Sequence, residues 1–172
     1  MEKERKDGQI YLVSTIILAV IVISIIAVSN YSNKNEFLDL QSLKDELNIE
    51  ASKVIDYGIS QGHTHQQINQ DLTGFTQIYI DTETRDKNLY FVFGTQDNIT
   101  LKGFQRTAHS VSLEGILVTS SPGTFFGSID PSASSVSLVI DGISHVFELK
   151  NGENFFFIIS REVGGQNYVI TG

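Results

Sequence analysis

The stretch IYLVSTIILAVIVISIIAV (residues 10–28) decides the fold that the sequence predicts, because it is the longest apolar run in the chain. It holds nineteen residues without a charge, a glycine or a proline. As a helix it would be roughly 28 Å long, close to the thickness of a bilayer hydrocarbon core. Its isoleucine and valine content suits a strand, but strands in compact domains are far shorter. The run therefore predicts a transmembrane helix over residues 9–30.

Basic residues beside the run predict its orientation. Lys3, Arg5 and Lys6 precede it, whereas Lys34 is the only cation shortly after it. Because Lys and Arg near a span stay on the cytoplasmic side, we expect a single-pass protein of the cell membrane with its N-terminus inside. The alternative is a removed secretory signal peptide, which would have a shorter apolar run and a small-x-small cleavage site.

Composition narrows the remaining functions. The 172 residues suffice for one domain with extensions. Residues 30–172 carry nine Lys and Arg against seventeen Asp and Glu, and no basic cluster, which argues against a nucleic-acid partner. The chain has no cysteine, so disulfides, thiolate catalysis and cysteine-ligated metals are excluded.

The charged residues before the run form a second signal. A short charged leader ending in RKDGQ (residues 5–9), followed by about twenty apolar residues, resembles the class III signal of archaeal type IV pilin-like proteins. The resemblance implies that a prepilin-type peptidase cuts between Gly8 and Gln9 and removes residues 1–8. It also implies that the retained helix contacts membrane lipid before assembly, and afterwards packs against copies of itself or other pilin-like subunits in a filament.

Small residues in the run mark where neighbouring helices could approach closely. They are Ser14, Ala19, Ser24 and Ala27. The function implied is a structural subunit, major or minor, of an archaeal cell-surface filament. The alternative is an uncleaved, membrane-anchored extracellular domain that binds a ligand through exposed aromatic residues such as Phe125 and Phe126.

Residues 31–62 predict an amphipathic stalk helix. Its apolar positions recur at steps of three and four and form one stripe, which consists of Leu40, Leu43, Leu47, Ala51 and Val54. Gly58 and Gly62 supply a stop signal.

Residues 63–172 predict an antiparallel β-rich, sandwich-like head and no second strong helix. Eight or nine short runs of β-type sequence begin with FTQIYID (residues 75–81) and are separated by turn residues. Asp141-Gly142 and Asn151-Gly152 are the clearest hairpin turns. Residues 119–135 predict an exposed loop with a short TFFGSI segment. The predicted fold class is thus α+β, a long N-terminal helix that carries this head.

No catalytic constellation emerges, and no cofactor is predicted. His63 and His65, with Asp71 as a third ligand, could hold a cation, but a solvated loop is the preferred interpretation, because a structural zinc site normally has four ligands; no metal site is predicted. Ser144 and His145 are adjacent on a predicted strand and so point to opposite faces.

Two sequons predict glycosylation. Asn98-Ile99-Thr100 lies at a predicted turn on the outside, and Asn30-Tyr31-Ser32 lies close to the predicted membrane surface.

Overall fold

The computed structural model describes residues 2–84, 86–131, 134–163 and 165–172, with the backbone alone for residues 2–16, 25–37 and 163. The chain divides into an N-terminal unit, Met1–Asp39, and a C-terminal unit, Leu40–Gly172. Helix α1 spans Glu2–Ser60, and α2 spans His65–Glu83. Within the described residues nine strands follow: β1 (Lys87–Gly94), β2 (Ile99–Gln105), β3 (Val111–Leu113), β4 (Ile116–Thr119), β5 (Gly123–Ile129), β6 (Ser135–Ile140), β7 (Ile143–Glu148), β8 (Asn154–Val163) and β9 (Gln166–Thr171).

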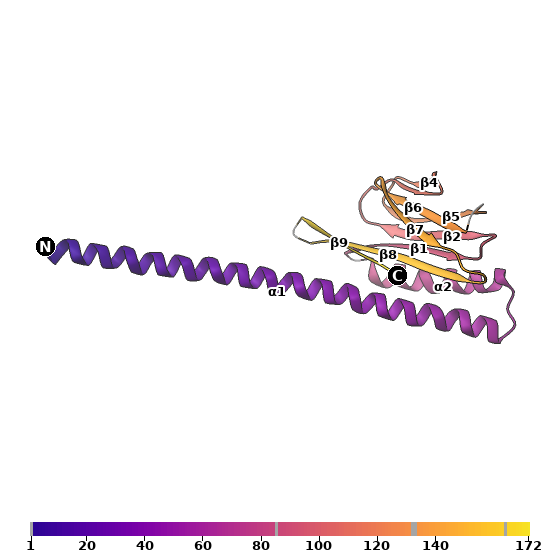
Figure 1. Cartoon of the computed structure of the whole chain (residues 1–172), viewed down its shortest axis with the longest axis horizontal. Helices are drawn as coiled ribbons and strands as arrows, with labels where there is room; N and C mark the ends of the chain where they lie inside the picture. Colours follow the sequence, from indigo (N-terminus) through magenta and orange to yellow (C-terminus); the bar gives the residue numbers. More distant parts are fainter. Residues whose placement is uncertain (1, 85, 132–133, 164) are drawn as a thin grey trace. The chain divides into compact units, whose positions relative to one another are not determined.

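The strands of the C-terminal unit form two antiparallel sheets (Figure 1). The first sheet has the order β5-β2-β1-β8-β9, and the second has the order β4-β3-β6-β7. One apolar cluster packs α2 and the C-terminal part of α1 against the first sheet, and another packs the two sheets together. The unit therefore consists of three layers, with the first sheet in the middle.

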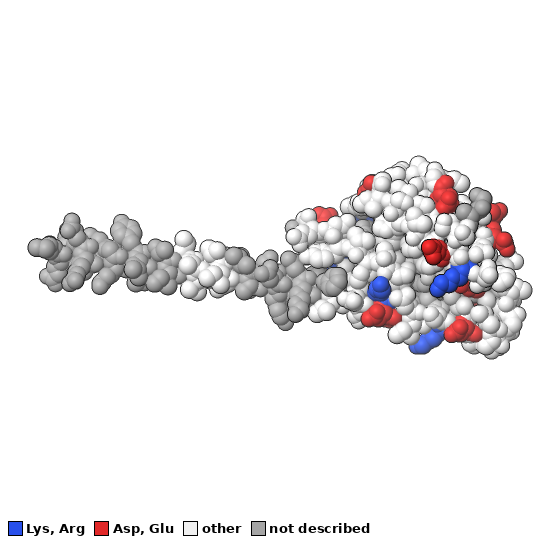
Figure 2. Space-filling view, viewed as in Figure 1, with Lys and Arg blue, Asp and Glu red and all other residues white. Residues whose placement is uncertain are grey.

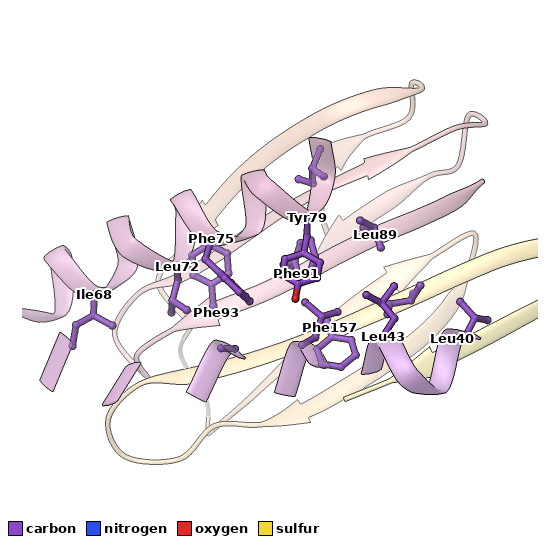
Figure 3. Packing of buried hydrophobic residues seen from close by; sticks show 14 residues of the cluster. Leu40, Leu43, Ile68, Leu72, Phe75, Tyr79, Leu89, Phe91, Phe93 and Phe157 are labelled. Carbon is purple, nitrogen blue, oxygen red and sulfur yellow. The ribbon is translucent and has the colours of Figure 1, made fainter. Parts of the chain in front are cut away.

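The central strand β1 shows why the middle layer is apolar on both faces. Phe91 and Phe93 pack toward the helices, whereas Tyr90 and Val92 pack toward the second sheet. Figure 3 shows residues of α1, α2, β1 and β8 meeting in the helix-side cluster. Because a strand alternates its side chains between faces, burial on both sides makes its sequence almost continuously apolar.

The predicted stripe on α1 is confirmed by burial. Leu40, Leu47 and Ala51 are at most 2% exposed, and Val54 packs partly buried against the same cluster. The helix ends in a Schellman motif, since His63 N donates to Gly58 O at 2.9 Å and Gly62 N donates to Ile59 O at 3.0 Å. Gly62 has a φ of 71°, which glycine adopts without strain.

The second helix, α2, corrects the prediction that residues from 73 onward are β-structured. FTQIYID lies inside this helix. A seven-residue window matches alternation by chance, but over the longer span the buried residues recur at helical steps, as Ile68, Leu72, Phe75, Thr76, Tyr79 and Ile80. Thr64 and Gln67 form a reciprocal capping box that begins the helix.

The predicted α+β fold class, a long N-terminal helix with a transmembrane half and an amphipathic half that carries a β-rich, sandwich-like head, is therefore wrong. Two antiparallel sheets are present as predicted, but α2 is an additional helix in the head. No helix in the described part of the chain has the length and apolar character needed to cross a membrane. Within the predicted span the structure describes the side chains of residues 17–24, a segment much shorter than the about twenty apolar residues that a span needs. The expected transmembrane helix and the single-pass location in the cell membrane are therefore corrected as well.

The two predicted hairpin turns have different outcomes. Asp141 and Gly142, with φ of 48° and 81°, join the paired strands β6 and β7, and this prediction is confirmed. Asn151-Gly152 is no hairpin, because β7 pairs with β6 while β8 pairs with β1 and β9. It lies in a connection that leads from one sheet to the other.

The predicted exposed loop over residues 119–135 contains an edge strand, β5, which pairs with β2 along its whole length. Its Gly127 permits a close approach between the sheets, because a Cβ there would lie 3.0 Å from Val118 Cγ1 of β4. The two sheets thus come together at β4 and β5.

Candidate functional site

Residues 17–24 of α1 form an exposed aliphatic segment in the N-terminal unit. Every side chain in it is exposed, and six are large and aliphatic: Ile17, Leu18, Val20, Ile21, Val22 and Ile23, each 47–65% exposed. Successive helix residues are about 100° apart, so this segment is apolar on all sides. It carries no charged residue (Figure 2).

Two of the predicted helix-packing residues lie in this segment. Ala19 is exposed, and so is Ser24, whose hydroxyl donates to Val20 O at 2.8 Å. The Ser24 hydroxyl is thus satisfied within its own helix and would not oppose apolar contact. The side chains of Gln9, Ser14, Ala27 and Asn30, and the environment of Gly8, lie outside what the structure describes.

The sequon residue Asn98 lies exposed in the turn between β1 and β2. Thr95 N donates to Asn98 O at 3.0 Å, and Asn98 N donates to Thr95 O at 3.3 Å. The Asn98 side chain donates to Asp130 Oδ1 at 3.2 Å. An exposed asparagine in a tight turn is accessible to modification, so glycosylation stays a prediction.

The three candidate cation ligands do not converge on one point. His63 Nδ1 lies 2.9 Å from Asp71 Oδ2, whereas His65 Nδ1 lies 2.5 Å from Glu153 Oε1. The described residues contain no group of three metal-ligating side chains. His63, in the loop before α2, contacts the carboxylate of Asp71, and His65, the first residue of α2, contacts that of Glu153.

A cleft of about 340 Å³ lies between the two sheets. It is lined by Tyr90 and Ile158 of the first sheet and by Ile143 and His145 of the second. The sheets meet closely at β4 and β5, and the cleft lies on the side of the other edge strands, β7 and β9.

Burial changes the ionisation of groups in this cleft. It lowers the pKa of His145, so the imidazole is neutral at pH 7. Burial, together with the charge of Asp141, raises the pKa of Tyr90 to about 12. The Tyr90 hydroxyl is buried and has no hydrogen-bond partner among the described residues. No pattern in the sequence marks Tyr90 as a site residue, because the continuous apolar run LYFVF (residues 89–93) is typical of a core strand.

At the mouth of the cleft, polar groups are paired with one another. His109 hydrogen-bonds to Asp141 and, at 2.6 Å, to Thr107 Oγ1. Ser110 N donates to Asp141 Oδ1 at 2.8 Å, and this bond, together with His109, lowers the pKa of Asp141. Ser160 accepts from Asn88 at 3.0 Å, while Ser144 bonds to Ser137 rather than to His145. Among the described residues of this cleft, the hydroxyl hydrogen-bonded to a histidine is therefore that of Thr107, and no serine is paired with a histidine there.

Of the two aromatic residues that were predicted to be exposed, Phe125 is buried and Phe126 is exposed. Phe125 is 7% exposed and lies in the cluster between the sheets, whereas Phe126 is 61% exposed. They are neighbours on β5, so their side chains point to opposite faces. Phe126 alone is available to a ligand.

The charges of the C-terminal unit are dispersed. Figure 2 shows Asp and Glu spread over the visible face, with few Lys and Arg between them. This distribution of charge agrees with the acidic net charge of -8, and the visible face has no basic patch.

Comparison with known protein families, with characterised proteins and with solved structures found no match to this chain.

Proposed function

We propose that this chain is a structural subunit of a filament of the archaeal type IV pilin-like kind. It assembles through its N-terminal helix after cleavage between Gly8 and Gln9. Its partners are copies of itself or related subunits that present the same kind of helix.

The observation that carries the proposal is the exposed aliphatic segment at residues 17–24. A helix that is apolar on every side is normally buried, because water cannot solvate it favourably. A second apolar helix covers such a segment without leaving a polar group unpaired, and the small side chains of Ala19 and Ser24 allow close approach. The leader-like sequence RKDGQ supports the same function independently.

The energy available from this contact is substantial. Full burial of an aliphatic side chain is worth about 1.5–3 kcal/mol, and these six side chains are roughly half exposed. Covering them would contribute roughly 1 kcal/mol each, before the cost of association. A subunit that contacts several neighbours in a filament gains this contribution along its helix.

Assembly is tested by placing a charge in the segment. Ile21→Asp should abolish filaments seen by electron microscopy, because a buried unpaired carboxylate is costly. Ile116→Asp is the matched control, since Ile116 is an isoleucine 60% exposed on β4. The control should assemble normally. Filaments of Ile21→Asp with normal abundance would contradict the proposal.

Processing is tested separately. Peptide mass spectrometry of the mature protein should find an N-terminus at Gln9, and Gly8→Val should retain residues 2–8 and prevent assembly. A mature chain that keeps these residues and stays monomeric would instead favour a binding domain that uses the C-terminal unit.

A further inference from the structure

A groove of about 610 Å³ lies between α2 and the edge strand β5. The wall formed by α2 includes Gln66 and Gln70, which lie on the face opposite the buried residues of that helix. The other side includes Phe126 and Ser128 of β5, and Asn98 lies at the turn before β2. The groove belongs entirely to the C-terminal unit and is independent of the proposed assembly segment.

The chemistry of the groove is neutral and rich in hydrogen-bonding groups. Amides and hydroxyls make up most of its lining, and the ionisable side chains among the described lining residues are His65 and Glu153. The Gln66 and Gln70 side chains are exposed. Amides both donate and accept, so they suit a ligand whose groups also do both. Hydroxyl groups have this property, whereas a phosphate or a carboxylate ligand would require cations.

Phe126 adds an apolar surface to this polar groove. Its side chain is 61% exposed, and its neighbour Phe125 already fills the space between the sheets. Lys102, opposite Phe126 on β2, is 7% exposed and donates to Thr73 O at 2.9 Å. An aromatic ring carries negative charge on its face, so it attracts the weakly positive C–H groups on the apolar side of a sugar ring.

Glu153 supplies an acceptor without a complete set of partners. Its side chain is 3% exposed and lines the groove. Oε1 lies 2.5 Å from His65 Nδ1, while Oε2 is buried and has no hydrogen-bond partner among the described residues. A buried carboxylate oxygen without a donor is costly, and a ligand hydroxyl is a donor of the right kind.

From this combination we propose that the groove binds carbohydrate, with a sugar ring on Phe126 and ring hydroxyls on Glu153 and the α2 amides. Two sources share this chemistry. One is a glycan attached to Asn98 of the same chain, which lines the groove. The other is an oligosaccharide of a different molecule.

The test for an external sugar uses the full chain produced without glycosylation. Neutral oligosaccharides of glucose, galactose, mannose and N-acetylglucosamine are presented on an array, and binding is quantified by calorimetry. We expect Phe126→Ala to weaken binding about tenfold, which corresponds to about 1.4 kcal/mol and lies within the range for a stacked ring. Gln70→Ala, an exposed position on α2, should also weaken it. Ile116→Ala, equally exposed on β4, should leave it unchanged.

The test for the chain's own glycan uses protein glycosylated at Asn98. Nuclear Overhauser contacts between sugar protons and the Phe126 ring, lost in Phe126→Ala but kept in Ile116→Ala, would identify this source. The proposal is overturned if no array sugar binds and the Asn98 glycan makes no contact with Phe126. It is also overturned if binding is unaffected by both Phe126→Ala and Gln70→Ala.

Discussion

At the scale of single residues, the C-terminal unit shows how one carboxylate can serve a turn and a long-range contact together. Asp141 occupies the first position of the β6–β7 hairpin turn with a positive φ of 48°. Its side chain accepts from Ser110 N at 2.8 Å and contacts His109. These donors favour the ionised form, which is why the pKa of Asp141 lies below its ordinary value of 3.8.

Asp141→Asn tests this coupling as a function of pH. Asparagine adopts the same turn, so the variant removes the charge and keeps the backbone. A lowered folded-state pKa contributes stability above the unfolded-state pKa, and this contribution disappears as pH falls through the folded value. We expect a loss at pH 7 below about 1 kcal/mol, because solvent screens the half-exposed pair. The loss should shrink as the pH falls below 3.8.

The measurement is the free energy of unfolding in urea at each pH. Asp97→Asn is the matched control, since Asp97 is an exposed aspartate in another tight turn. Equal destabilisation by Asp141→Asn at pH 7 and far below pH 3.8 would contradict the coupling.

At the scale of elements, α2 depends on both its cap and its buried face. Thr64 accepts from Gln67 N at 3.4 Å, and Gln67 Oε1 accepts from Thr64 N at 2.8 Å. This arrangement satisfies donors that the first helical turn leaves unpaired. Gly62 terminates α1 at its C-terminal end, so that only a short connection separates α1 from α2.

Thr64→Ala should lower the free energy of unfolding by about 1 kcal/mol, since the N-cap hydroxyl is lost. The measurement is urea denaturation followed by far-UV circular dichroism. Thr95→Ala is the control for removing a threonine hydroxyl from a turn outside the helix. Identical stability of Thr64→Ala and the unmodified chain would show that the capping box does not stabilise α2.

At the scale of the whole molecule, each described unit presents its aromatic and aliphatic residues differently. The C-terminal unit buries Phe91 and Phe157 completely, while the segment at residues 17–24 of the N-terminal unit exposes its aliphatic side chains. In the C-terminal unit, the apolar surface buried between its layers stabilises the fold. The exposed segment has that stabilisation available only through contact with another molecule.

Phe91→Ala and Phe126→Ala form a matched pair for this distinction. Phe91 is fully buried in the central strand, so its truncation should cost about 3–5 kcal/mol through lost burial and the cavity left behind. Phe126→Ala should change stability by less than about 0.5 kcal/mol, because the ring is largely exposed. Thermal and urea unfolding of both variants provide the measurement. Similar losses for the two would show that Phe126 contributes to the core.

Local patterns predicted several elements correctly. The stripe on α1, the Asp141-Gly142 hairpin and most strands follow from side-chain periodicity and from the positive φ that glycine accepts. The capping box THQQ (residues 64–67) could also have identified α2, because its residues are adjacent in sequence. The β3–β4 hairpin has a comparable signal in Glu114-Gly115, both with positive φ.

The sequence by itself determined the elements whose partners lie within a few residues: helix faces, caps and tight turns. Only the tertiary structure decided which strands share a sheet, that β5 is an edge strand, and that Glu153 lies beside His65. The physical reason is that such contacts join residues far apart in the chain, and local propensity carries no information about them. The groove beside Phe126 exists for the same reason, because α2 and β5 meet only in the folded C-terminal unit.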